Sequence, residues 1–313
     1  MKYRLLKMKF STPVHFGDGR LETSGGTLLA DTLFSSVCSE IVSVSGETAL
    51  ESFVSKCREG KIKFSDCFPY DNKNFYLPKP MIELKDEKKE EEHRKKIKRL
   101  SYISSDKIDS FISLKIDIEA EMEKLKKIGK SGYKAQAAIF ENRDAEPYTV
   151  GTYAFEDGRG LYFILGYEEE DDYKETAPYI ESLGYSGIGG KKNSGFGKFT
   201  ISESIKDKEP KFPKDIKKRL DGNYEKYMNI SVGFPSENEM ESVKGAKYKL
   251  LKRSGFIYSD SYNENQVKKK DFFAFNSGSC FDEKFEGDIF DLSSSYGKHP
   301  VYRYMMPLFL GVI

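Results

Sequence analysis

Residues 184–199 of this 313-residue sequence combine glycines, lysines and small polar residues, which suit the binding of a ligand. They read Gly-Tyr-Ser-Gly-Ile-Gly-Gly-Lys-Lys-Asn-Ser-Gly-Phe-Gly-Lys-Phe. Glycine adopts positive φ freely and lets a backbone approach a ligand closely. Consecutive exposed N–H groups in such a loop form an anion-binding concavity, and Lys191, Lys192 and Lys198 add positive charge. The stretch is therefore predicted to be a loop that clasps a phosphate backbone.

Two common phosphate-binding motifs do not fit this loop. A P-loop, G-x-x-x-x-G-K-[ST], would need glycine in place of Tyr185 and serine or threonine in place of Lys192. A dinucleotide loop, G-x-G-x-x-G, would need a third glycine at Lys192 and a following helix, whereas residues 196–204 have the pattern of a strand. The mismatches exclude the nucleotide-cofactor enzymes that use these motifs, and no cofactor is expected.

Cysteine and histidine are too few and too scattered to form a metal site. The four cysteines contain no C-x-x-C pair, and the three histidines complete no zinc spacing. Met1-Lys2-Tyr3-Arg4 leads into an alternating strand rather than an apolar signal segment. No run approaches the roughly 18 apolar residues of a membrane span. We therefore expect a cytoplasmic protein with reduced thiols.

The net charge of the chain limits how it can bind nucleic acid. The formal net charge is +1, so any contact with nucleic acid must come from local patches rather than from a field over the whole surface. The chain length predicts about two domains.

The spacing of apolar residues predicts the strands and helices that position the loop. Residues 2–10 alternate as a strand, and 27–44 carry an apolar stripe at helical spacing. The start of that helix, preceded by Ser24-Gly25-Gly26 and near Arg20, is either an anion site or an ordinary helix cap. Further strands are expected at 61–68, 75–81, 161–166 and 196–204, a helix at 171–183, and a hairpin at 133–155 with arms 134–140 and 148–155.

Two other segments are notable for their charge. Residues 83–127 are predicted to be an exposed helical insertion with acid-first i, i+4 pairs, serving as a solvated face or as a partner-docking surface. Residues 207–219 are expected to be a basic linker. Beyond the linker, strands are expected at 227–234, 246–259, 271–281 and 301–312, with a short helix near 237–243. Lys268-Lys269-Lys270 beside Phe272 and Phe273 is either a single-stranded RNA contact or a solvated turn entering a buried strand.

The glycine stretch resembles the glycine-rich loop of the RAMP superfamily of CRISPR RNA-binding proteins, in its glycine spacing and in its trailing Gly-Phe-Gly-Lys. In that superfamily the loop joins the last helix and last strand of a ferredoxin-like (RRM-like) domain. The resemblance implies an α+β fold with two such domains. The first spans 1–205, with the insertion at about 83–127 and a thumb hairpin at about 133–155. The second, at 206–313, is degenerate and strand-rich.

The whole chain resembles the subunit family that caps the 5′ end of crRNA in type III-A CRISPR–Cas effector (Csm) complexes. Residues 12–17 (Thr-Pro-Val-His-Phe-Gly), 26–34 and 299–304 carry this resemblance with the loop. It implies a non-catalytic subunit in antiviral defence. That subunit binds the repeat-derived crRNA 5′ tag and contacts a large Palm-domain subunit and a crRNA-backbone subunit, with target RNA reached indirectly.

The resemblance also implies the RNA-binding residues. Lysines would pair phosphates, and Asn193 and Ser194 would either read a base edge or bond sugar and phosphate. The expected residues are Gly187, Gly189, Gly190, Lys191, Lys192, Asn193, Ser194, Gly195, Gly197, Lys198, His15, Arg20 and Arg143.

Three alternatives remain open at this point. A metal-independent RAMP endoribonuclease that processes repeat RNA would need His15 as its acid–base group. Target cleavage would need an acidic residue such as Asp18 or Asp31. A structural adaptor without RNA contact would have no need for the lysines of the glycine stretch.

Overall fold

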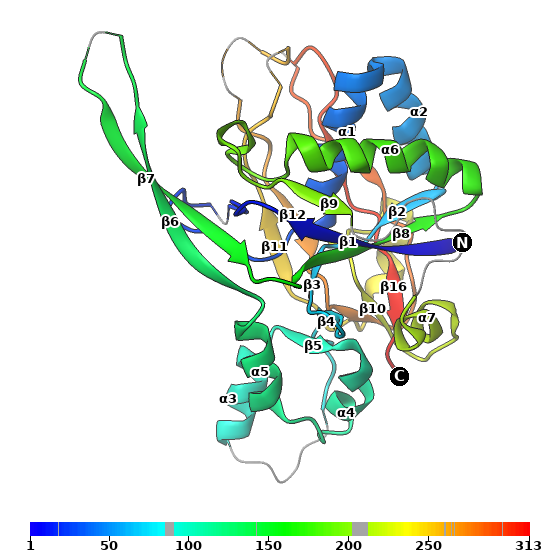
Figure 1. Cartoon of the computed structure of the whole chain (residues 1–313). Helices are drawn as coiled ribbons and strands as arrows, with labels where there is room; N and C mark the ends of the chain where they lie inside the picture. Colours follow the sequence, from blue (N-terminus) through cyan, green and yellow to red (C-terminus); the bar gives the residue numbers. More distant parts are fainter. Residues whose placement is uncertain are drawn as a thin grey trace.

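The chain folds into a mixed arrangement of helices and strands (Figure 1). The computed structural model describes residues 1–17, 19–84, 91–141, 143–201, 212–259, 261–263, 265, 267–295 and 297–313; for 91–94 only the backbone is described.

The central sheet is antiparallel and has the strand order β2-β8-β1-β9. Its members are β1 (Lys2–Phe10), β2 (Ile62–Phe64), β8 (Gly160–Tyr167) and β9 (Phe199–Ile201), and β3 (Phe68–Tyr70) also pairs with β8. Strand β8 is buried along its whole length, because it lies between two strands and is covered on both faces. The strands predicted at 2–10, 61–68, 161–166 and 196–204 are thus confirmed as members of one sheet.

Three helices cover one face of this sheet: α1 (Ala30–Ser45), α2 (Glu47–Arg58) and α6 (Glu170–Ser186) (Figure 1). Since side chains alternate across a strand, Leu6 and Met8 of β1 and Phe163 of β8 point into this helical layer. The opposite residues Leu5, Tyr162 and Ile164 belong to a second core with the insertion and the C-terminal part. Helix α2 was not expected from the sequence.

The predicted hairpin is confirmed and is longer than expected. Strands β6 (Gly129–Ala138) and β7 (Glu146–Phe155) pair over their full length and project away from the body of the molecule (Figure 1). Val150 near the base is fully buried, whereas Tyr133 and Ile139 are 80% and 87% exposed. The outer part of the hairpin is therefore held mainly by strand pairing rather than by burial in a core.

The insertion lies directly before the hairpin in the chain. Strands β4 (Tyr76–Pro78) and β5 (Tyr102–Ser104) pair, and helices α3 (Glu91–Arg99), α4 (Ile108–Ile112) and α5 (Ile118–Lys126) surround them. Buried Glu121 accepts hydrogen bonds from the Ser104 amide and hydroxyl, both 2.8 Å away. The expected helices are confirmed, β5 was not foreseen, and the predicted i, i+4 pairs lie outside the described residues and side chains.

The C-terminal part is rich in short strands. It contains a sheet of order β13-β10-β16 and two ribbons, β11-β12 and β14-β15. The strands are β10 (Tyr227–Asn229), β11 (Leu250–Arg253), β12 (Phe272–Phe275), β13 (Cys280–Phe281), β14 (Ile289–Asp291), β15 (Tyr302–Tyr304) and β16 (Phe309–Gly311). Residues Glu237–Val243 form a 3₁₀ helix, as the predicted short helix suggested.

Several expected boundaries were wrong. The proposed linker contains helix α7 (Lys214–Asp221), because Ile216 and Leu220 bury one face of it; its residues 207–211 lie outside the described part. The expected strand at 61–68 splits into β2 and β3 at Asp66. The expected strand at 301–312 splits into β15 and β16, which pair in different sheets on either side of Pro307.

A buried charge cluster fixes α1 to the C-terminal part. Asp31 accepts from Nε and Nη2 of Arg253, each at 2.9 Å, and from Nη1 of Arg303. Its carboxylate is 1% exposed. Burial alone raises the pKa of Asp31, but Arg253 and Arg303 outweigh it and hold the pKa below its usual value. These contacts give Asp31 a structural role and provide no support for its nomination as a cleavage residue; Asp18 lies outside the described part.

Within the described ranges, none of the helices has both the length and the apolar character needed to cross a membrane.

Candidate functional site

The glycine stretch, residues 187–198, is a loop closed at its base by two buried side chains. Helix α6 ends at Ser186, and Gly187 follows with φ +84°. The Ile188 amide donates to the Gly197 carbonyl at 3.0 Å. Ile188 is fully buried and Phe196 nearly so, whereas residues 193–195 at the tip are exposed. The base of the loop is thus fixed by buried side chains, and its tip is exposed to solvent.

The base of the loop is fastened to the segment that follows β1. The Gly190 amide donates to the His15 carbonyl and the Gly197 amide to the Pro13 carbonyl, both at 2.9 Å, and the Lys198 amide donates to Thr12 Oγ1 at 3.0 Å. These amides are unavailable to a ligand, so the expected row of free N–H groups is shorter than predicted. Among the described residues, the amides of Lys191, Lys192 and Asn193 have no hydrogen-bond acceptor.

The glycines are required first for packing. A Cβ at Gly189 would lie 2.8 Å from Phe16 Cδ1, and one at Gly190 would lie 2.7 Å from His15 Cδ2. At Gly197 (φ +73°) it would lie 2.0 Å from the Ile188 carbonyl oxygen. Gly195 differs, because nothing lies within 4 Å and only its φ of +85° favours glycine. The loop therefore owes its position to close backbone contacts that other residues would block.

Replacing Gly197 by alanine should displace the loop, because the new Cβ clashes with fixed backbone and the positive φ is strained. We expect a loss of about 2–3 kcal/mol in the free energy of unfolding and weaker binding of whatever ligand the loop holds. Urea unfolding measures the first effect. Gly195→Ala is the matched control, since it adds the same methyl group to open space; equal effects of the two substitutions would contradict the packing argument.

The lysines of the loop face aromatic side chains rather than acids. Lys191 Nζ lies 4.8 Å from the ring centroid of Tyr148 on β7, and Lys192 Nζ lies 4.7 Å from that of Tyr258. On β6, Lys134 Nζ lies 5.2 Å from the Phe196 ring. No carboxylate among the described residues forms a salt bridge with these lysines or with Lys198. Their charge therefore remains available for a phosphate.

Sequence reasoning missed Lys134, Tyr148 and Tyr258 as neighbours of the loop. Their positions depend on how the hairpin and a distant C-terminal segment fold back, which no local pattern reveals. The one usable signal was the register of the hairpin, in which Lys134 pairs with Val150 and Tyr148 with Gln136.

The predicted residues outside the loop are placed differently from one another. His15 is buried beneath Gly190, and its Nδ1 lies 2.8 Å from the Gly151 carbonyl of β7, so it joins the loop to the hairpin. Arg20 is exposed on the turn whose Leu21 carbonyl accepts from the Gly151 amide. Arg143 lies at the far tip of the hairpin, 3.6 Å from the Phe140 ring and paired with Glu146. The turn between β6 and β7, which carries Arg143, lies at the projecting end of the hairpin (Figure 1).

The start of α1, for which the sequence left an anion site and an ordinary helix cap open, has an acceptor within the chain. The Ala30 amide is buried and donates to Asp66 Oδ1 at 2.7 Å, and Val232 donates to the same oxygen at 3.0 Å. Burial raises the pKa of Asp66 to about 7, partly offset by these amide bonds. The helix start therefore already has an internal carboxylate partner and is closed to an external phosphate.

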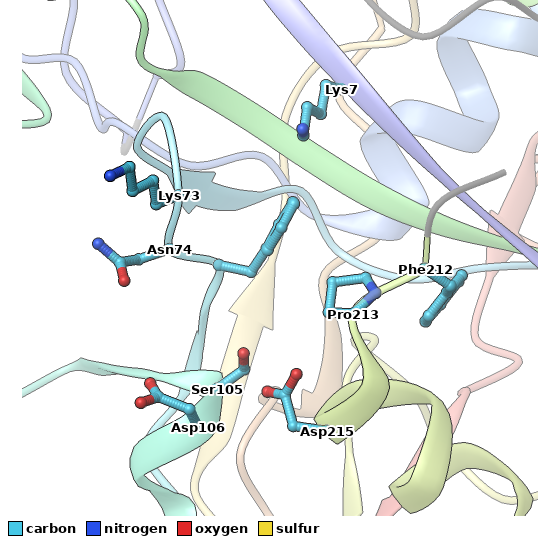
Figure 2. Close-up of a pocket in the computed structure, with 9 residues that line it drawn as sticks. Lys7, Lys73, Asn74, Ser105, Asp106, Phe212, Pro213 and Asp215 are labelled. Carbon is cyan, nitrogen blue, oxygen red and sulfur yellow. The ribbon is translucent and has the colours of Figure 1, made fainter.

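A separate pocket of about 500 Å³ lies below the sheet, between β1, the turn at 73–74, and the start of α7 (Figure 2). Lys7 and Lys73 lie on one side of it, and Asp106 and Asp215 lie across from them (Figure 2). None of the predicted RNA-binding residues lines it. Its opposed charges do not favour a polyanion, and it does not belong to the loop site. Among the described residues, no cluster of His, Cys, Asp or Glu is arranged to hold a metal ion.

Comparisons with known proteins agree along the whole chain. The family model described as CRISPR Csm4 C-terminal domain matches residues 222–312. A Mycobacterium tuberculosis (strain H37Rv) protein described as CRISPR system Cms protein Csm4 is 32% identical, covering 100% of this chain and 98% of the relative. Its Streptococcus thermophilus counterpart is 30% identical, covering 99% and 98%.

Solved structures show the same fold. A chain of the Csm3–Csm4 subcomplex of a type III-A CRISPR–Cas interference complex matches with a TM-score of 0.66 and 19% identity, covering 99% of both chains. A chain of the Csm1–Csm4 cassette in complex with cA4 matches with a TM-score of 0.59 and 19% identity, covering 99% of this chain and 97% of the other. With 32% identity over its entire length to a Csm4 protein, this chain belongs to the Csm4 family, the fourth subunits of type III-A CRISPR–Cas (Csm) complexes.

Proposed function

We propose that this subunit binds the repeat-derived 5′ tag of crRNA through the tip of the glycine loop and has no catalytic role of its own. The observation that carries the proposal is the set of loop lysines that face aromatic rings and pair with no described carboxylate. Phosphate contacts from lysine supply affinity for a nucleic-acid backbone. The backbone amides of Lys191 and Lys192 are free to donate hydrogen bonds to phosphates of the same RNA strand.

The exposed tip of the glycine loop recognises the bases of the tag. Asn193 and Ser194 present amide and hydroxyl groups that suit base edges or sugar hydroxyls. Tyr148 and Tyr258 flank the lysines and offer ring faces for stacking against unpaired bases. His15 acts beneath the loop as a positioning residue.

The hairpin β6–β7 is proposed to act as a thumb beside the guide. It projects from the body next to the loop and is tied to the loop by the Lys191–Tyr148 and Lys134–Phe196 contacts (Figure 1). Arg143 lies in the turn between β6 and β7, at the projecting end of the hairpin, and contacts Phe140 and Glu146 there. We assign it to RNA beyond the tag.

The assembly role rests on relatives. Solved structures that share this fold include a Csm3–Csm4 subcomplex and Csm1–Csm4 cassettes. These support a subunit that links a large Palm-domain subunit to the crRNA-backbone subunit in the cytoplasm. We also propose that residues 1–205 form a ferredoxin-like domain, supported by the antiparallel order β2-β8-β1-β9 with its helices on one face, followed by a degenerate one at 206–313.

Photo-crosslinking tests the function. The protein is co-expressed with its neighbouring subunits and a crRNA that carries a photoreactive nucleotide either in the tag or in the first guide positions. Tag crosslinks should fall within 190–198 or on Tyr148 and Tyr258, and guide crosslinks on the outer part of the hairpin around Arg143. Tag crosslinks confined to other segments would overturn the proposal, and a wild-type complex loaded with an untagged guide is the control.

A further inference from the structure

Lys191 adopts a backbone conformation that is unusual for a residue with a side chain. Its φ of +59° and ψ of +22° place it in the left-handed region. Leu114 is the one other described residue besides glycine with a positive φ. A β-carbon is strained in this region, so the surrounding structure has to hold the residue there. Glycine would take the conformation without strain, so the contacts of the lysine side chain are what the position gains.

The backbone around Lys191 is fixed on both sides. The Gly190 amide donates to the His15 carbonyl, and the Lys191 carbonyl accepts from the Ser194 amide, both at 2.9 Å. The start of the side chain therefore has a fixed position. Its ammonium does not, because a lysine side chain is long and flexible. The position of the charge depends on what the ammonium contacts.

The hairpin provides that contact through Tyr148 of β7. Lys191 Nζ lies 4.8 Å from the centroid of the Tyr148 ring and forms a long hydrogen bond, 3.5 Å, with its hydroxyl oxygen. An ammonium can only donate, so the hydroxyl oxygen is the acceptor. The hydroxyl hydrogen is used elsewhere, since Tyr148 donates to Gln136 Oε1 at 2.7 Å. Gln136 thereby keeps a lone pair of the Tyr148 oxygen available to Lys191.

The bond between Tyr148 and Gln136 crosses the hairpin. The two residues lie directly opposite each other in the register of β6 and β7, so their side chains point to the same face. Lys134 lies on that face as well, two residues before Gln136, and its Nζ is 5.2 Å from the Phe196 ring of the loop. The contacts thus run in both directions, with a loop lysine on a hairpin ring and a hairpin lysine on a loop ring.

These contacts lie outward of the point where the hairpin joins the body. Among the described residues, the outermost backbone hydrogen bond between the two is that of the Gly151 amide with the Leu21 carbonyl. Val150 beside it is fully buried, and beyond this point the hairpin projects from the body (Figure 1). A cation–ring contact at a partly exposed site is weak. Tyr148 therefore holds Lys191 only while the hairpin lies against the loop.

The contact with Tyr148 leaves Lys191 able to bind RNA. An ammonium has three N–H donors, so two remain for a phosphate. The ring and the hydroxyl also restrict the lysine side chain before RNA arrives. Less conformational freedom is then lost on binding, so a lysine held in this way binds a phosphate more tightly than a free one.

We propose that Tyr148 and Gln136 are positioning residues of the tag site, which hold the Lys191 ammonium where it meets a phosphate of the tag. Tag binding is then coupled to the position of the hairpin, because the tag binds best when the hairpin lies against the loop. Coupling of this kind is reciprocal, so the bound tag also holds the hairpin in place. The inference rests on the proposed tag binding and adds its control by the hairpin.

Two variants of the full chain test the positioning role by fluorescence anisotropy with a labelled tag oligonucleotide. Tyr148→Phe keeps the ring but removes the hydroxyl, and Gln136→Met keeps the length but removes the acceptor. Each should weaken tag binding by about 3- to 10-fold, the range for one lost hydrogen bond, with little change in melting temperature. In the Lys191→Ala background neither should weaken binding further, since both residues act through Lys191.

Tyr133→Phe is the matched control. It removes the same hydroxyl group from a tyrosine of β6 that is exposed and lies on the other face of the hairpin, so tag binding should not change. A loss equal to that of Tyr148→Phe would contradict the positioning role. Hydrogen exchange tests the reciprocal effect: added tag RNA should slow exchange in residues 134–138 and 146–150 more in the wild type than in Tyr148→Phe. Equal protection of the two proteins would contradict the coupling.

The Lys191→Ala variant separates this inference from the proposed function. Tag binding by Lys191→Ala at the wild-type level would overturn both. Weaker binding by Lys191→Ala, with wild-type affinity of Tyr148→Phe and Gln136→Met, would leave the tag site in place and overturn the positioning role alone. So would a loss by Tyr148→Phe that persists in full in the Lys191→Ala background, because the hydroxyl would then contact the RNA directly.

Discussion

Replacing Lys191 and Lys192 together by alanine is expected to weaken binding of the crRNA 5′ tag by about 10- to 100-fold at low salt. Each lysine is expected to make a charged hydrogen bond to a phosphate, worth roughly 1.5–3 kcal/mol before neighbouring contacts compensate. Neither side chain forms a salt bridge among the described residues, so the folded protein should lose no ion pair. Fluorescence anisotropy with a labelled tag oligonucleotide measures the change.

The salt dependence makes this result specific. For single-stranded nucleic acid each neutralised phosphate contributes about 0.7 to the slope of log K against log salt, so the double variant should lose about 1–1.5 units of slope. Lys217→Ala with Lys218→Ala is the matched control, since both are exposed neighbours on α7, distant in sequence from the loop. An unchanged slope in the loop variant would remove the lysines from the RNA interface.

Replacing Asp31 by alanine should cost about 3–5 kcal/mol in the free energy of unfolding. The substitution leaves buried Arg303 and partly buried Arg253 without their carboxylate, and uncompensated buried charge is among the most destabilising changes in a protein. Because the cluster joins α1 to strands β11 and β15, its loss should loosen the C-terminal part from the helical face. Urea unfolding monitored by circular dichroism measures the loss.

Two further variants test whether the loss of stability comes from the buried charge of Asp31. Asp106→Ala removes an exposed carboxylate that forms a salt bridge with the adjacent Lys107, and it should change stability by no more than about 0.5 kcal/mol. The pKa of Asp31 is depressed in the folded state, so its stabilisation is present above the unfolded-state pKa of about 3.9 and is lost as pH falls below it. Asp31→Asn should flatten this acid limb; a loss under about 1 kcal/mol for Asp31→Ala would contradict the account.

Local pattern was a good guide where an element buries one regular face. The alternation of residues 2–10 and the apolar stripe of α1 match the alternating and helical periods, and both elements formed close to the expected bounds. The long hairpin was also foreseen. Local pattern failed where burial is irregular: α2 was missed, and α7 was taken for a linker because its charged residues outnumber its three buried ones.

The strand at 301–312 illustrates a second kind of failure. Arg303 is its one charged residue, and within the apolar run 304–310 the sequence offers no break other than Pro307. In the structure the first half pairs with β14 and the second with β10. Which partner each half takes is decided by segments that lie far away in the sequence, and no propensity within the run carries that information.

The glycine loop, its lysines and the family can be recognised in the sequence, because glycine spacing and charge are local properties of the chain. Which loop amides stay free depends on the folded structure, since the neighbouring segment 12–15 accepts hydrogen bonds from several of them. The folded structure alone closes the start of α1 with Asp66 and brings Tyr148 and Tyr258 to the lysines. Burial and charge compensation depend on residues that meet only after folding, so their pairings cannot be read from neighbours along the chain.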